Sequence, residues 1–185
     1  RSYGNRVKMI DNNTWASIPV NASFDSYSKI KIAEMSSVVK IGKRIRHWSE
    51  QKKYFYSDRL LPLIDRLIKN DESNLGQLNI DLIKIVMESI GHNKTKIIID
   101  DNDWKDLSRA EMIKNLLSSY GEVFLSGNSA KNYLKKEEIN QINSILFQKV
   151  NTEVGFESIV HIIAENKDPL KYINSIAQWK ILSES

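Results

Sequence analysis

The chain has 185 residues, of which 41% are apolar and 27% are charged, with a net charge of +4. This composition allows one domain with a hydrophobic core and is too weakly basic for a dedicated nucleic-acid binder, and the absence of cysteine excludes disulfides, thiolate nucleophiles and cysteine-ligated zinc. No apolar run approaches the roughly 20 residues that cross a bilayer, and no signal peptide is visible, so we expect a cytoplasmic protein without a membrane span.

The first predicted element is a β-hairpin. Residues 6–10 and 15–20 alternate between two faces, as strands do, and the Asp-Asn-Asn-Thr stretch between them favours a turn. The same alternation in residues 29–33 predicts a third short strand.

From Ser37 onward, apolar residues recur at helical spacing. This spacing predicts a first helix through Trp48 and a second over residues 54–69. A third helix is predicted over 79–90, with Asn79 as its N-cap and Gly91 just beyond its end.

Strands and helices alternate in the second half of the chain. Ser108 and Glu111 form a capping-box pattern at the start of a helix that ends before Gly121. The other predicted elements are strands at 95–99, 122–127 and 145–150 and helices at 128–139, 156–165 and 168–182. The alternation predicts an α/β fold, with a helix-rich single domain around a partly parallel sheet and an N-terminal β-hairpin.

Three stretches resemble blocks of the WbqC-like proteins. NRVKMIDNNTWASIPV, at residues 5–20, is similar to that family's Asn-Arg-x-(Lys/Arg)…Trp-x-x-x-Pro-Val signature. GEVFLSGNSAKNYL at 121–134 and FESIVHII at 156–163 resemble two later blocks in the same order. Two departures stand out, because the family's opening strand-loop motif and Asp-Asp pair are absent, and His161 stands where the family usually has Asp. We therefore expect residues 1–185 to form a single domain that lacks the family's N-terminal strand and loop.

The resemblance implies a cytoplasmic step in the synthesis of bacterial surface polysaccharides such as O-antigen. It implies a transferase, with glycyl or other acyl transfer to an amino sugar as the candidate reaction and no cofactor. The expected partner is an anionic small molecule such as a nucleotide-linked sugar. The alternative is a non-catalytic binding or scaffold protein of polysaccharide assembly, because the sequence contains no complete catalytic set.

The first candidate substrate site comprises Asn5, Arg6 and Lys8. Arg6 and Lys8 are two residues apart and so share one strand face. An arginine fork and a lysine point charge suit a diphosphate or a carboxylate. The same residues also fit an ordinary solvated hairpin face, and the family signature is what favours a role in binding.

The second candidate is the bend at Ser126, Gly127 and Ser129. A bend between a strand and a helix offers free N–H groups to an anion, although simple capping of the helix explains the same residues. Tyr133, in the same block, is a candidate sugar contact. We expect this bend and the cationic hairpin to open onto one cleft.

His161 is the candidate general base, because its imidazole titrates near neutral pH, while a hydrogen-bonded core histidine is the alternative. Basic and aromatic residues between 43 and 56 suggest either a solvated helix face or, less well, nucleic-acid binding, and we expect no nucleic-acid partner. Asp100, Asp101 and Asp103 fit a turn better than a metal site. No histidine pair has zinc-ligand spacing, so we expect no metal.

Overall fold

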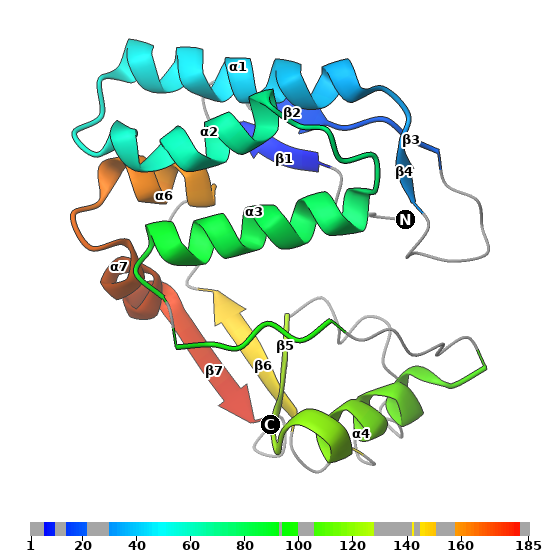
Figure 1. The fold of residues 1–185 in the computed structure, drawn as a ribbon. Coiled ribbons are helices and arrows are strands. Elements are labelled where there is room, and N and C mark those ends of the chain that lie inside the picture. The colour runs from blue at the N-terminus through cyan, green and yellow to red at the C-terminus, as the bar shows by residue number, and fades with distance from the viewer. Residues whose placement is uncertain are drawn as a thin grey trace. The chain divides into compact units, whose positions relative to one another are not determined.

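The computed structural model describes residues 6–9, 14–21, 30–92, 94–99, 106–127, 142, 145–150 and 158–181. For 6–9, 14–15, 148–150 and 177–181 it describes the backbone. The elements group into two compact units, shown in Figure 1. Unit 1 comprises Arg1–Thr95 and Phe156–Tyr172, and unit 2 comprises Lys96–Gly155 and Ile173–Ser185. The single domain expected from the sequence stays a prediction.

Unit 1 begins with the predicted hairpin. Strand β1 (Arg6–Met9) pairs antiparallel with β2 (Thr14–Ser17). A second antiparallel pair joins β3 (Val20–Asn21) to β4 (Lys31–Ile32), which confirms a short strand within residues 29–33.

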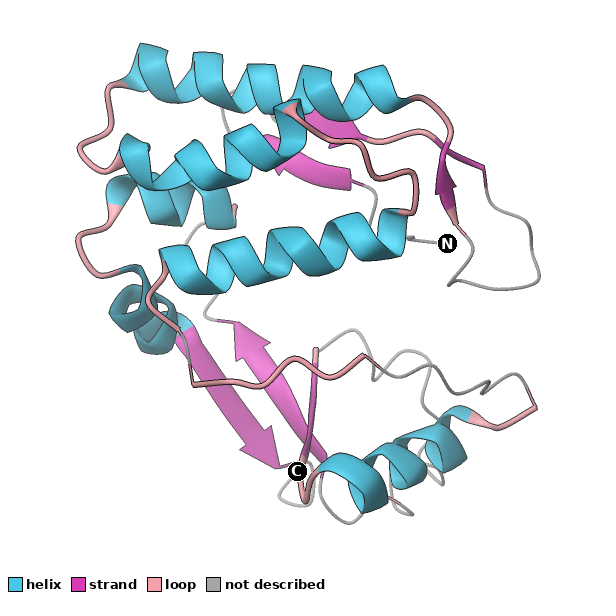
Figure 2. Cartoon of the chain, viewed as in Figure 1, coloured by secondary structure: helices cyan, strands magenta, loops and turns pink. Residues whose placement is uncertain are grey.

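Four helices of unit 1 pack around one hydrophobic core, and Figure 2 shows them beside the hairpin. They are α1 (Met35–Lys52), α2 (Leu61–Ile68), α3 (Leu75–Ser89) and α6 (Ile159–Glu165). A 3₁₀ turn, η3 (Ser57–Leu60), leads into α2, and α7 (Pro169–Ile176) continues from unit 1 into unit 2. No described helix is both long enough and apolar enough to cross a bilayer.

Two helix predictions need correction. The helix expected over 54–69 covers only α2 and so begins at Leu61. Pro62 explains this start, because it has no N–H to donate and fits the first turn of a helix rather than its interior. Helix α3 begins at Leu75 rather than near Asn79, because the Asn74 side chain accepts a hydrogen bond from the Gln77 N–H at 3.1 Å and caps the helix earlier.

The predicted end of α3 is confirmed. Gly91 adopts a positive φ of 76°, which glycine tolerates best. The His92 N–H donates to the Met87 carbonyl at 2.8 Å, and the Gly91 N–H donates to the Glu88 carbonyl at 3.0 Å. This pair of bonds is a Schellman motif, which satisfies the last carbonyls of the helix.

Helices α1 and α2 approach closely at Gly42. This residue is buried, and a Cβ atom added to it would lie 2.8 Å from Ile68 Cγ1 and 2.9 Å from Leu67 Cβ. Beside this contact Arg46 Nη2 donates to Asp65 Oδ1 at 3.1 Å. A residue without a side chain therefore sets the spacing of the two helices.

Unit 2 combines one helix with a mixed sheet. Helix α4 (Arg109–Tyr120) begins with the predicted capping box, since the Ser108 Oγ accepts from the Glu111 N–H and the Glu111 carboxylate accepts from the Ser108 N–H. The sheet order is β5 (Phe124–Ser126), β6 (Ile145–Val150) and β7 (Ala177–Ile181). The β5–β6 pair is parallel and the β6–β7 pair is antiparallel. The helix-rich chain with small sheets, a parallel pair and an N-terminal hairpin confirms the predicted α/β class.

Two further expectations are wrong in unit 2. The last predicted helix stops at Ile176, because residues 177–181 pair with β6 and become a strand. Residues 95–99 lie outside any strand, and Ile98 and Ile99 are 45% and 54% exposed. No described strand pairs with this segment, and an extended segment needs a hydrogen-bonding neighbour to become part of a sheet. The helix expected at 128–139 lies outside the described residues.

Candidate functional site

His161 lies in a small aromatic cluster of unit 1. The first turn of α6 is capped by Ser158, which holds His161 one turn into the helix. The imidazole lies 5.2 Å from the ring of Tyr54, edge to face, and 5.8 Å from the ring of Trp48. The side chain is only 12% exposed. The packing therefore resembles the alternative reading of His161, a histidine partly buried in the core.

The Glu165 carboxylate lies against the imidazole of His161. The Nε2 and Oε2 atoms are 2.7 Å apart, one helical turn along α6. Nδ1 is buried and has no hydrogen-bond partner in the described part of the chain, so a proton there would be an unsatisfied donor. The pairing therefore selects the tautomer in which Nε2–H donates to the carboxylate. Glu165 is 48% exposed, so the fixed carboxylate is the member of the pair that reaches solvent.

The segment after α1 is fastened to the end of α6. The Tyr56 N–H donates to the Ala164 carbonyl at 3.1 Å. Arg59 Nη1 donates to the carbonyls of Asn166 and Lys167 at 3.0 and 3.2 Å, and its guanidinium lies 4.3 Å from the centre of the Tyr56 ring. These contacts connect the segment that follows Tyr54 to the residues that follow His161, and so hold the aromatic cluster together.

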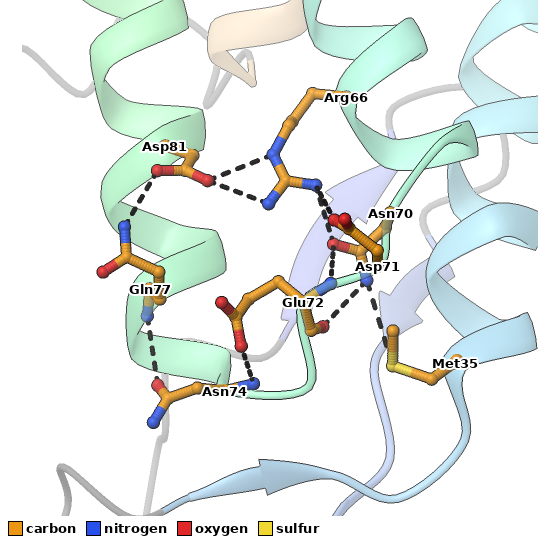
Figure 3. Close-up of polar contacts among 8 residues, drawn as sticks. All are labelled: Met35, Arg66, Asn70, Asp71, Glu72, Asn74, Gln77 and Asp81. Atoms are coloured by element: carbon orange, nitrogen blue, oxygen red, sulfur yellow. Dashed lines mark hydrogen bonds and ion pairs between the residues drawn. The ribbon is translucent and has the colours of Figure 1, made fainter.

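A second polar cluster joins α2 to α3 (Figure 3). Arg66 donates to Asp81 Oδ2 from Nε at 3.1 Å and from Nη2 at 2.8 Å, and Nη1 donates to Asn70 Oδ1 at 2.9 Å. The hydrogen bond from Arg66 lowers the pKa of Asp81 below its usual value. Gln77 Nε2 occupies the other Asp81 oxygen at 3.0 Å. The charges of Arg66 and Asp81 thus satisfy each other.

The loop between these helices completes the cluster. Asn70 donates to the Glu72 carbonyl at 3.0 Å, and the Glu72 carboxylate accepts from the Asn74 N–H at 2.6 Å. Strand β4 is tied to the same loop, because the Ile32 N–H donates to the Ser73 carbonyl at 2.8 Å. The second polar cluster therefore stabilises the fold.

An apolar cavity of about 470 Å³ also lies within unit 1. It is lined by Ala16, Ile18, Ile41, Ile45, Leu63, Leu67, Asn79, Leu82, Ile83, Val86, Met87, Ile159 and Val160. The volume is typical of small-molecule pockets. None of the described residues in this lining is charged, and Asn79 is the polar residue among them. His161 and Glu165 do not belong to the lining either.

A model of the WbqC-like protein family matches residues 1–160 of the chain. The chain belongs to the WbqC-like family. Searches among curated proteins and among solved structures found no match. Membership suggests a role in polysaccharide-related biosynthesis. His161 lies one residue beyond the matched range, so its role draws no support from the match.

Arg6 and Lys8 of the WbqC-like signature lie on β1, where they are paired with Ser17 and Trp15 of β2. Their side chains, like the whole of Asn5, lie outside the description. That the two cations share one face of the strand stays a prediction from their spacing.

Only the beginning of the later block is described. Ser126 ends β5 and is buried, and its Oγ lies 3.4 Å from the Gly127 carbonyl oxygen. Gly127 is exposed, whereas Ser129 and Tyr133 lie outside the described residues. The hairpin belongs to unit 1 and the bend to unit 2, so their common cleft stays a prediction.

The remaining candidates of the WbqC-like chain are weaker. Within the described ranges, no group of three or more His, Asp, Glu or Cys side chains is placed to hold a metal ion. The predicted turn at Asp100, Asp101 and Asp103 lies outside those ranges.

Glu165 is the residue that our reading of the sequence missed. Its position four residues after His161 is visible in the sequence and places the two side chains on one helix face. Helical spacing was therefore the signal that could have found it.

Proposed function

We propose that this WbqC-like chain is a transferase that acts in the cytoplasm on a precursor of bacterial surface polysaccharide such as O-antigen. The reaction is transfer of a glycyl or other acyl group to the amine of a nucleotide-linked or similar anionic amino sugar. The family match over residues 1–160 is the observation that carries the proposal.

In this proposal the cations of β1 hold the anionic part of the substrate. Arg6 and Lys8 occupy one strand face, and Asn5 precedes them. The bend at residues 126–129 and Tyr133 position the sugar. The exposed backbone of Gly127 supports this assignment, because it leaves room for close approach of a ligand.

The His161–Glu165 pair supplies the base. The amine nitrogen bonds to the acyl carbon, the bond from that carbon to the donor's leaving group breaks, and the amine proton passes to the pair. Glu165 accepts it, because its carboxylate is half-exposed, while His161 positions the carboxylate through the 2.7 Å contact. This assignment gives the catalytic role predicted for His161 to the pair of residues.

The test is to incubate the full chain with nucleotide-linked amino sugars and activated acyl or aminoacyl donors and to measure mass gain of the sugar. Glu165→Gln should lower kcat about a hundredfold with little change in KM, as loss of a general base does. Glu88→Gln, which alters an exposed carboxylate on α3, is the matched control and should leave kcat unchanged. Full activity of Glu165→Gln would show that the pair takes no part in the reaction, and it would not contradict the proposed transferase activity.

Arg6→Ala separates binding from folding. It should abolish the thermal stabilisation by nucleotide sugar while the melting temperature of the free protein stays nearly constant. A large loss in the free protein would instead make Arg6 a structural residue.

A non-catalytic scaffold is the second candidate. The apolar cavity favours it, because none of the described residues that line it is an acid, a base or a nucleophile. Absence of mass gain together with absence of stabilisation by any nucleotide sugar would decide for the scaffold.

A further inference from the structure

The positive charge of the chain is concentrated in residues 40–59, which we call the basic segment. It contains seven Lys and Arg residues against two acidic residues, a net charge of +5, whereas the whole chain carries +4. The rest of the molecule is therefore close to neutral, at −1. Lys40 and Arg46 pair with acids outside the segment, and Lys52 also has an interaction partner, while Lys40, Lys43, Lys52 and Lys53 are all exposed.

A phenylalanine protrudes from the same segment. Phe55 is 87% exposed, the most exposed of the large apolar side chains in the described part of the chain. It lies in the turn between α1 and η3, and the next residue, Tyr56, donates its N–H to the Ala164 carbonyl of α6. Exposure of a whole aromatic ring to water is unfavourable, which raises the question of what covers it.

Both neighbours of Phe55 in the chain are held by contacts within unit 1. Tyr54 packs 5.2 Å from the rings of both Trp48 and His161. Tyr56 is held by its N–H bond to Ala164 and by the guanidinium of Arg59. Because the residues on either side face the protein, the ring of Phe55 is directed outward by a rigid backbone and not by a loose loop.

Two lysines precede Phe55 closely in the chain. Lys52 ends α1 and Lys53 caps it in the left-handed region, with φ of 50°, where glycine is the usual residue. Both are exposed, so the turn carries two ammonium groups next to one apolar protrusion.

We propose that the basic segment docks on the surface of an anionic phospholipid bilayer. Phe55 enters the boundary between headgroups and acyl chains, while Lys52 and Lys53 contact the phosphate and carboxylate groups around it. Clustered lysines are attracted to the negative potential of such a surface, and an inserted aromatic ring adds apolar burial.

Other polyanions fit this surface less well. Single-stranded nucleic acid needs several exposed aromatic rings for successive bases, but Trp48, Tyr54 and Tyr56 are already packed within unit 1. An acidic protein would need an apolar core at its interface, whereas Phe55, which lies edge to face with Tyr56 at 4.9 Å, is the one highly exposed apolar side chain described in the basic segment. One exposed aromatic ring that follows two exposed lysines in the chain matches a lipid surface better than either.

The experiment is co-sedimentation of the full chain with phosphatidylcholine vesicles and with vesicles that contain one third phosphatidylglycerol. We expect binding to the anionic vesicles only, falling with added salt. Lys52→Gln with Lys53→Gln should weaken it about thirtyfold, and Phe55→Ala about tenfold. Far-UV circular dichroism and melting curves check that the variants are folded.

Matched controls remove the same chemistry elsewhere. Lys94→Gln with Lys96→Gln deletes two exposed lysines outside the basic segment, and Tyr120→Ala deletes an aromatic ring that is 48% exposed. Both should bind anionic vesicles within about twofold of the parent, because neither site lies in the basic segment.

Three results would overturn the proposal. These are no binding to anionic vesicles, equal binding to neutral ones, and an unchanged affinity of Phe55→Ala. If the lysine variant alone loses affinity and also loses retention on a single-stranded oligonucleotide, the basic segment is a nucleic-acid surface instead.

Discussion

Replacement of Gly42 by alanine tests the close contact of α1 with α2. The new Cβ would lie 2.8 Å from Ile68 Cγ1. An ordinary contact between carbons is at least about 3.5 Å, so the helices would have to separate by about 0.7 Å. In an exposed helix the same substitution would stabilise by about 1 kcal/mol. Overpacking at a buried contact costs about 1–3 kcal/mol, so we expect a net loss of about 1 kcal/mol.

The assay is urea unfolding at 25 °C, followed by circular dichroism and by tryptophan fluorescence so that two-state behaviour is checked. Gly42→Val should destabilise further, because it adds two more carbons at the same contact. Gly121→Ala is the control, since a Cβ there meets nothing within 4 Å and its φ is an extended 179°. An alanine variant that is more stable than the parent would refute the reasoning, because helix propensity would then outweigh the contact.

Three smaller predictions concern charges and caps. Asp81→Asn should destabilise by about 1–2 kcal/mol at pH 7, because it removes the acceptor of the Arg66 bonds. The pKa of Asp81 is lowered in the folded state, so its contribution is present above the unfolded value near 3.8 and is lost as pH falls further. The gap between the two proteins in urea unfolding should therefore begin to close below about pH 4 and vanish only below the lowered pKa of Asp81 in the folded state, and a gap that does not shrink as the pH falls would contradict the ionic explanation. Asn74→Ala and Ser108→Ala each delete an N-cap and should each cost about 1 kcal/mol in the same assay, with Ser118→Ala, exposed in α4, as a control that changes little.

The relation between the two units bears on the function. The cationic hairpin lies in unit 1 and Gly127 in unit 2, so variants can test the two candidate substrate contacts separately. The His161–Glu165 pair and the basic segment belong wholly to unit 1. If nucleotide sugar no longer raises the melting temperature of Arg6→Ala but still raises that of Ser126→Ala, binding is assigned to unit 1 alone.

Local signals in the sequence predicted much of the candidate site's framework. Gly91 as the end of α3 and the capping box before α4 are predictable because a helix must satisfy its terminal N–H and carbonyl groups with nearby residues. The hairpin that carries Arg6 and Lys8 was predictable from the two-residue alternation of its strands and from the turn residues between them.

Tertiary structure decided what depends on distant partners. Residues 177–181 can extend a helix by their spacing, yet their alternation of Trp179 and Ile181 with polar residues also fits a strand, and pairing with β6 selects the strand. The aromatic residues between 43 and 56 look alike in sequence, but Trp48 and Tyr54 pack against His161 while Phe55 is left in water. Local patterns thus determine helices, caps and strand faces, because these depend on hydrogen bonds between near neighbours. Burial decides which ring, which histidine and which lysine can meet a ligand, because it depends on segments a hundred residues apart in the chain.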